Sequence, residues 1–274
     1  MMAKWVALSL LMLPAPFIAA SASSQQVELI AHRGESADAP ENTLAAVQLA
    51  WDRGVAGVEI DVHLTSDDRL AVIHDADTRR TTGVSRVVRE STLAELSGLD
   101  AGSWKAAAWA NEPIPTLEDV LETVPENGRL YIEVKVGAEA IPALARAIEL
   151  RAKRADQLVI ISFQADAVAE AKRRLPHIEA YYLASFKQDS ISGDWTPGLD
   201  ELLRTANEID ADGLDLSVNG PVDADFVRRV KGVGLDFYVW TVDDPEVARR
   251  MIAAGVDGIT TNRAAALERE LAGK

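Results

Sequence analysis

The chain alternates strand-like and helix-like segments eight times, and this alternation limits its fold more than any other feature. The expected strands are residues 27–31, 58–64, 130–135, 158–163, 178–183, 212–216, 236–241 and 256–261. Most are apolar on both faces, as are strands of a parallel sheet covered by helices. A segment with helical periodicity follows each one. Eight β–α units predict an α/β fold of the (β/α)8 TIM-barrel type.

Two other features complete the expected architecture. An open doubly wound sheet is the alternative fold, but it needs a glycine-rich phosphate turn after the first strand, and "AHRGESADAPENT" does not supply one. The interval from residue 66 to residue 115 is longer than the other connections. We expect a short strand at 70–74 and a small insertion, at about 78–114, after the second strand. One barrel domain would then span residues 23–274.

The first residues resemble an export signal. Lys4 precedes an apolar run, and Ala20 and Ala22 occupy the −3 and −1 positions of an A-x-A cleavage site. The run is short and is broken by Pro14 and Pro16, which argues against a membrane-spanning helix. We expect residues 1–22 to be a cleaved signal peptide and the protein to be exported to the periplasm or secreted; an uncleaved anchor is the alternative.

The charge of the chain restricts its partners. The formal net charge is −15, so the surface repels nucleic acid and anionic membranes. Neither nucleic acid binding nor stable membrane insertion is therefore expected. A small anionic substrate remains compatible, because screening confines most exposed-charge effects to about 8 Å. The sequence does not indicate an oligomeric state.

Three carboxylates lie on expected strands that would be neighbours in the barrel. Glu59 and Asp61, two residues apart, point to the same face of the second strand, and Glu133 lies on the next long strand. Residues at the carboxyl ends of barrel strands line the active face. Three converging carboxylates repel one another unless a cation binds them, and oxygen ligands without cysteine suit Ca²⁺ or Mg²⁺. We therefore predict that Glu59, Asp61 and Glu133 bind a divalent metal.

Histidines and cations occur at the same expected rim. His32 and His74 are candidates for general base and general acid, because imidazole titrates near neutral pH. Arg33 and Lys135 would add an anion site beside the metal. The sequence does not decide which histidine is the base.

The motifs in this order resemble those of glycerophosphodiester phosphodiesterases. They are "HRGESADAPENT", "EIDVHLTSDDRLAVIHD", "IPTLEDVL", "YIEVK", "VWTVDD" and "GVDGITTN", and they extend from His32 to Asn262. The resemblance implies a TIM barrel that hydrolyses a glycerophosphodiester to an alcohol and sn-glycerol 3-phosphate. It also implies that Glu59, Asp61 and Glu133 bind the metal.

The same resemblance assigns the remaining roles. His32 and His74 would be the catalytic acid and base, while Arg33 and Lys135 would bind phosphate. Independently of the resemblance, Phe163 and Trp240 lie at the ends of expected strands and are predicted to form an apolar wall for the glycerol carbons; ordinary packing at the top of the barrel is the alternative.

The chain departs from the family pattern at two positions. Asp243 stands where the family usually has Asn, and Ala264 where Pro is common; both are expected at helix starts, away from the chemistry.

Three other functions remain open. A lysophospholipase D or sphingomyelinase D-like enzyme would act on lipids. An aldolase-type barrel would use Lys135 as a Schiff base, and a non-catalytic exported barrel would only bind its ligand.

Overall fold

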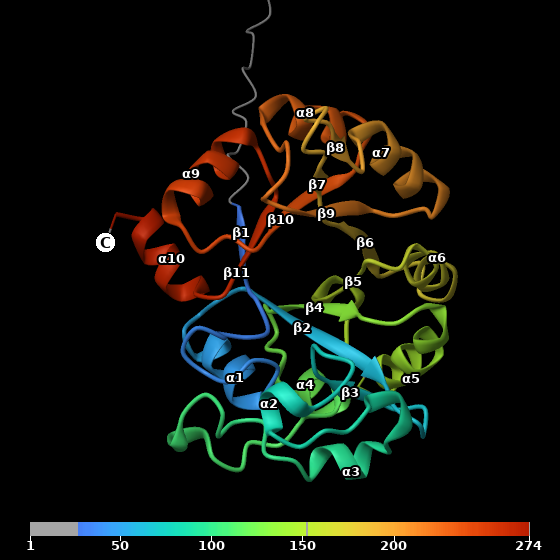
Figure 1. Ribbon diagram of the computed structural model, residues 1–274, viewed down its shortest axis with the longest axis vertical. Coiled ribbons are helices and arrows are strands. Elements are labelled where there is room, and N and C mark those ends of the chain that lie inside the picture. The colour runs from blue at the N-terminus through green and yellow to red at the C-terminus, as the bar shows by residue number, and fades with distance from the viewer. Residues whose placement is uncertain (1–26, 152, 274) are drawn as a thin grey trace, which may run out of the picture.

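Eight parallel strands form a closed barrel in the computed structural model, which describes residues 27–151 and 153–273 (Figure 1). The strand order is β1-β11-β10-β9-β6-β5-β4-β2-β3, and β1 also pairs with β2, which closes the ring. The antiparallel β3 lies outside it as a short partner of β2. The expected TIM barrel is confirmed. The predicted signal peptide, residues 1–22, lies outside the described residues.

The boundaries of the barrel strands agree closely with those expected, and a helix follows each strand. The barrel strands are β1 (Glu28–Ala31), β2 (Gly57–Leu64), β4 (Arg129–Val134), β5 (Leu158–Ser162), β6 (Glu179–Ala184), β9 (Gly213–Ser217), β10 (Asp236–Trp240) and β11 (Gly258–Thr261). The outer helices are α1 (Leu44–Asp52), α4 (Leu117–Thr123), α5 (Ile141–Arg151), α6 (Ala165–Arg174), α7 (Leu199–Glu208), α8 (Ala224–Gly232), α9 (Pro245–Ala254) and α10 (Ala264–Leu271).

Helix α9 shows how the local sequence sets these boundaries. Asp244 caps its N-terminus by accepting hydrogen bonds from the backbone N–H groups of Glu246 and Val247. Pro245, which lacks an N–H group, fits the first turn. Gly255 ends the helix at φ 97°, a left-handed conformation that glycine adopts without strain.

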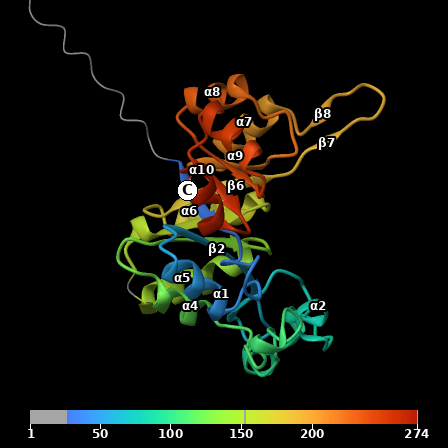
Figure 2. The same ribbon diagram turned by 90° about the vertical axis from the view of Figure 1, so that its left-hand side faces the viewer.

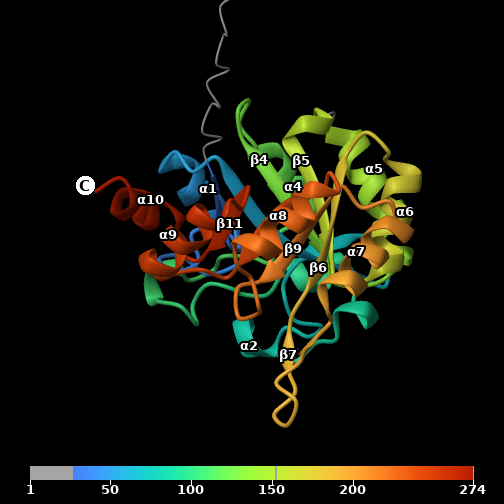
Figure 3. The ribbon, with the colours of Figure 1, turned by 90° about the horizontal axis from the view of Figure 1, so that it is seen from above.

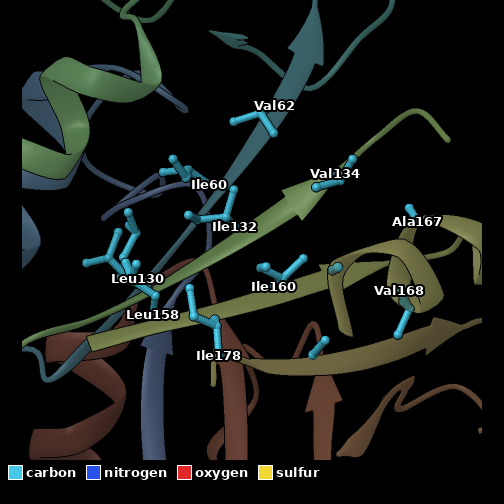
Figure 4. Packing of buried hydrophobic residues seen from close by; sticks show 14 of the residues in the cluster. Ile60, Val62, Leu130, Ile132, Val134, Leu158, Ile160, Ala167, Val168 and Ile178 are labelled. Atoms are coloured by element: carbon cyan, nitrogen blue, oxygen red, sulfur yellow. The ribbon is translucent and has the colours of Figure 1, made fainter. Parts of the chain in front are cut away.

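Apolar side chains fill the space between the strands and the helices. Ile60, Ile132 and Ile160 lie side by side on β2, β4 and β5 and are fully buried against the helical layer (Figure 4). Each such side chain contributes about 1.5–3 kcal/mol by burial. Alternate residues of the same strands point into the barrel, so a polar residue at an inward position faces the barrel axis.

Two segments extend from the carboxyl ends of the strands. After β3 (Leu70–Val72), the chain forms α2 (Arg79–Thr82), α3 (Leu93–Ser97) and two 3₁₀ turns, Val88–Glu90 and Ala107–Trp109, before α4. After β6, the short strands β7 (Lys187–Gln188) and β8 (Trp195–Thr196) form a projecting hairpin. Figures 2 and 3 show this hairpin and α2 on the same side of the barrel. Among the described residues, none of the helices combines the length and hydropathy needed to cross a membrane.

Candidate active site

Three carboxylates converge inside the barrel. Asp61 of β2 lies opposite Glu133 of β4 in the parallel register, and Glu59 is two residues earlier on β2. One oxygen from each lies within 4.8 Å of the other two. Glu59, Asp61 and Glu133 are only 3%, 0% and 8% exposed, respectively. The structure thus brings the three predicted metal ligands together.

The electrostatics of this cluster suit a bound dication. Burial, with the neighbouring Asp61 and Glu133 charges, raises the pKa of Glu59 well above its usual value. Burial and Asp61 raise the pKa of Glu133 to about 7. Within the described part of the chain, Oε1 of Glu59 is buried without a hydrogen-bond partner, and Oδ1 of Asp61 is buried with only an ion-pair contact, to Lys135 at 3.2 Å. Carboxylate oxygens left in this state are the ligands that Ca²⁺ and Mg²⁺ prefer. The donor set therefore fits such an ion.

Arg33 and Lys135 lie beside the carboxylates. The Nε atom of Arg33 is 3.2 Å from Oδ2 of Asp61, and Nζ of Lys135 is 2.7 Å from Oε1 of Glu133 and 3.2 Å from Oδ1 of Asp61. These contacts hold the pKa of Asp61 low, at about 2, despite its burial. Two cations against three carboxylates leave one net negative charge. A dication would make the site net positive by one, which matches a phosphodiester anion.

Neighbouring side chains fix two of these groups. Asn42 accepts a hydrogen bond from the backbone N–H of Asp61 (3.0 Å) and donates its amide N–H to Oδ2 of the same residue (2.7 Å). Glu41 accepts from Nη1 of Arg33 at 2.9 Å and binds both terminal nitrogens of Arg80. Glu41 therefore orients Arg33.

His32 is held by a chain of hydrogen bonds. Its Nδ1 lies 2.7 Å from Oδ1 of Asn262, and Nδ2 of Asn262 donates to Oδ2 of Asp243 at 2.7 Å. An ionised carboxylate only accepts hydrogen bonds, so Asp243 orients the Asn262 amide with its oxygen toward His32. Nδ1 of His32 then carries the proton, and Nε2 faces Glu59, whose Oε2 is 4.0 Å away. Asp243 was expected to lie away from the chemistry; that expectation is wrong, because its carboxylate lies two hydrogen bonds from His32.

His74 has a different partner. Its Nδ1 lies 2.7 Å from Oδ1 of Asp75, a carboxylate that also binds Arg80 of α2. His63 contacts the backbone carbonyl of His74 through Nε2 at 2.9 Å. His63 therefore supports the position of His74. Asp75 and Arg80 were not singled out from the sequence, because their roles depend on how the insertion folds back over the barrel.

A cavity of about 180 Å³ unites these groups. Its polar lining consists of His32, Arg33, Glu59, His74, Glu133, Lys135, Asp215, Thr241 and Thr260. Its apolar lining consists of Ile161, Phe163, Leu183 and Trp240. The rings of Phe163 and Trp240 meet edge to face, with centroids 5.6 Å apart. All nine predicted site residues thus lie in or beside one pocket.

Asp215 is the ionisable residue lining this cavity that sequence analysis missed. It lies on β9, in a segment recognised only as an apolar strand. Its inward position at the same end of the barrel as the carboxylate cluster was the available signal.

Comparison with known proteins agrees with this geometry. A family model described as the glycerophosphoryl diester phosphodiesterase family matches residues 32–266. The chain belongs to this family. The membership identifies it as a phosphoric diester hydrolase, as the motifs predicted.

Similar proteins cover nearly the whole domain. A glycerophosphodiester phosphodiesterase of Caldanaerobacter subterraneus subsp. tengcongensis is 35% identical over 85% of this chain and 93% of its own length. Another from Bacillus altitudinis is 32% identical over 86% of this chain and 94% of its own. The solved structure of an Oleispira antarctica phosphodiesterase in complex with sn-glycerol-3-phosphate has a TM-score of 0.80 and 29% identity, over 90% of this chain and 97% of that one. The lipid-directed, aldolase-type and purely binding alternatives gain no support from these relatives.

Proposed function

We propose that this protein hydrolyses water-soluble glycerophosphodiesters to an alcohol and sn-glycerol 3-phosphate, using Ca²⁺ or Mg²⁺. The observation that carries the proposal is the pocket in which the three buried carboxylates, two cations and two histidines meet. The similarity to a phosphodiesterase solved with sn-glycerol-3-phosphate supports the same substrate class.

Glu59, Asp61 and Glu133 would hold the metal, which supplies charge neutralisation at a phosphoryl oxygen. Arg33 and Lys135 bind the remaining phosphoryl oxygens. Their charges lie on the inner wall of the cavity, where low solvent access strengthens the attraction for an anion. Because both cations contact the carboxylates in the structure described here, binding of substrate and metal redistributes these contacts.

His32 serves as the general base. Its Nδ1–H donates to the neutral amide of Asn262, which leaves the Nε2 lone pair free. Burial, with the nearby Arg33 charge, lowers the pKa of His32 and favours the neutral imidazole that a base requires. The proton that His32 removes comes from water or from the 2-hydroxyl of the glycerol moiety, and in the second case a cyclic phosphate forms first.

His74 serves as the general acid. Its Nδ1 lies 2.7 Å from Oδ1 of Asp75, and this contact holds the ring in position. Its side chain is 31% exposed, against 17% for His32, so it lies closer to solvent. The alcohol therefore leaves on the His74 side of the pocket, toward the loops. Phe163 and Trp240 line the same pocket, where they pack against the glycerol carbons.

The test is a product assay on the purified protein. Glycerophosphocholine is offered with Ca²⁺, with Mg²⁺ or with a chelator, and released sn-glycerol 3-phosphate is measured. We expect product with one of the ions and loss of activity with the chelator. Failure to release glycerol 3-phosphate under any condition would refute the proposed substrate class, and release that the chelator does not reduce would refute the metal.

We also propose that residues 1–22 direct export and are removed. The support is the sequence of this segment, with its lysine, its apolar run and the Ala20 and Ala22 pair. Cell fractionation combined with N-terminal sequencing tests it: a mature chain that begins at Ser23 outside the cytoplasm is the expected result. A full-length chain that stays in the cytoplasm would contradict it.

A further inference from the structure

Asp215 is a buried carboxylate for which the proposed chemistry has no use. It lies near the middle of β9, is 2% exposed, and lines the same cavity as the catalytic groups. Its Oδ1 is buried and accepts no hydrogen bond from any described residue. Polar groups that are buried in this way almost always have a partner, so an orphan in a pocket points to a ligand.

The strands around Asp215 supply no donor to it. Its register neighbours are Leu183 on β6 and Tyr238 on β10. Leucine has no polar atom, and the Tyr238 hydroxyl lies 3.4 Å from both Glu28 and the Tyr131 hydroxyl, at the other end of the barrel. The partner of Asp215 must therefore come from within the cavity.

Asp215 also stands apart from the metal cluster. Among the described acidic residues and histidines, the only group of three or more whose ligand atoms all lie within 4.8 Å of one another is Glu59, Asp61 and Glu133. Burial raises the pKa of Asp215 well above its usual value, and the Glu133 charge adds to the effect. A carboxyl group in this environment gains most from a neutral hydroxyl, which satisfies its oxygen without adding charge.

Trp240 ties the aromatic wall of the cavity, formed by Phe163 and Trp240, to Asp215. The indole N–H of Trp240 donates to the backbone carbonyl of Asp215 at 3.1 Å, and its ring meets that of Phe163 edge to face. A phosphate held by Arg33 and Lys135 would direct a short carbon chain along this wall. Among the carboxyl groups of the described residues that line the cavity, that of Asp215 is the one outside the metal cluster.

We propose that the side chain of Asp215 binds a hydroxyl of the glycerol moiety and so selects glycerol esters over other phosphate esters. The inference rests on the proposed function and names a substrate-binding residue for it. A site that binds a substrate hydroxyl rejects analogues that lack it, because a buried polar group is then left unpaired.

The experiment pairs variants with ligands that each lack one hydroxyl. The ligands are sn-glycerol 3-phosphate, propane-1,3-diol monophosphate, which lacks the central hydroxyl, and propane-1,2-diol 1-phosphate, which lacks the terminal one. Their affinities for the metal-loaded protein are measured by calorimetry, so that a chemical role of the 2-hydroxyl does not enter. In the wild type we expect one of the two analogues to bind about 10- to 100-fold more weakly than glycerol 3-phosphate.

Asp215→Leu should remove this preference. The affinity for glycerol 3-phosphate should fall, while the affinity for the weaker-binding analogue should stay within about threefold of its wild-type value. Asp215→Asn, which keeps a carbonyl acceptor, should retain part of it. Asp236→Asn is the matched control, because Asp236 also faces the barrel interior but at the opposite end, where it accepts from the Tyr181 hydroxyl. This variant should keep the wild-type preference.

Several outcomes would overturn the inference. The wild type could bind all three ligands equally well, or Asp215→Leu could keep the wild-type preference. Asp215→Leu could also lose the same factor in affinity for all three ligands, or bind Ca²⁺ or Mg²⁺ at least 10-fold more weakly than the wild type. The proposed function fails separately, if the wild type shows the preference but releases no glycerol 3-phosphate from glycerophosphocholine.

Discussion

The side-chain oxygen of Asn262 lies 2.7 Å from Nδ1 of His32, although 230 residues separate them in the chain. The contact joins the end of β11 to the end of β1, which are adjacent because the barrel closes between these strands. The orientation of the Asn262 amide is set by Asp243, which accepts its N–H. A carboxylate thus controls the protonated nitrogen of His32 through an amide.

Replacing Asp243 by Ala should disturb this arrangement. Alanine cannot accept the N–H of Asn262, so the Asn262 amide is free to turn that N–H toward His32. Loss of one charge-assisted hydrogen bond, worth about 1.5–3 kcal/mol, predicts a fall in kcat of about 10- to 100-fold. The pH profile should also shift on its acidic side. Asp244→Asn, which keeps the cap of α9, is the control, and an unchanged pH profile in Asp243→Ala would count against the chain of contacts.

Removing either of the two proposed catalytic histidines should reduce turnover by about 10²–10⁴. His32→Ala should also abolish the rise of kcat with pH, because a base acts when deprotonated. His177→Ala, an exposed residue after α6, is the control. Activity close to that of the wild type in His32→Ala or His74→Ala would refute that assignment.

Replacing Lys135 by Met should change metal and substrate binding in opposite directions. The ammonium group competes with a dication for Glu133 and Asp61, so its loss should strengthen Ca²⁺ or Mg²⁺ binding by about 10-fold. KM for the phosphodiester should rise by a similar factor, because one phosphate contact is lost. Calorimetry and steady-state kinetics measure the two effects, with Lys187→Met on the exposed β7 as control. Weaker metal binding together with the higher KM would contradict this role.

The metal-free protein should gain stability from Glu133→Gln as pH rises. The folded-state pKa of Glu133 is raised to about 7, so its neutral form is favoured, and the wild type loses stability as pH rises through that value. At pH 5 the two proteins should be similar; at pH 8 the variant should be more stable by on the order of 1–3 kcal/mol. The lowered pKa values of His32 and His63 increase the stability of both proteins as pH rises. This contribution is common to the wild type and the variant, so it does not change the difference in stability between them.

Denaturant unfolding in chelator at several pH values provides the measurement. With Ca²⁺ or Mg²⁺ in excess, the wild type should be more stable than Glu133→Gln at pH 8, because only the wild type keeps all three ligands and gains binding free energy from the ion. A difference in stability that does not change between pH 5 and pH 8 would contradict the raised pKa.

Much of the fold and site could be predicted from sequence because the information is local. Strand periodicity placed Glu59 and Asp61 on one face, and the barrel rule brought Glu133 to them. Asp215 was not predicted to be a site residue because a single acidic residue in an apolar strand forms no local sequence pattern. The contacts of Asp243 and Arg80 were not predicted for a different reason: each depends on which distant segment lies opposite, and sequence periodicity does not contain that information.

The link from Arg80 through Glu41 to Arg33 has a consequence for engineering. Arg80 belongs to α2, outside the barrel, whereas Arg33 faces the reaction centre. Exchanging the α2 segment between relatives in order to change the alcohol they release would therefore also alter phosphate binding by Arg33, unless the new segment supplies an arginine that contacts Glu41. A chimera without such an arginine should lose leaving-group preference and catalytic efficiency together.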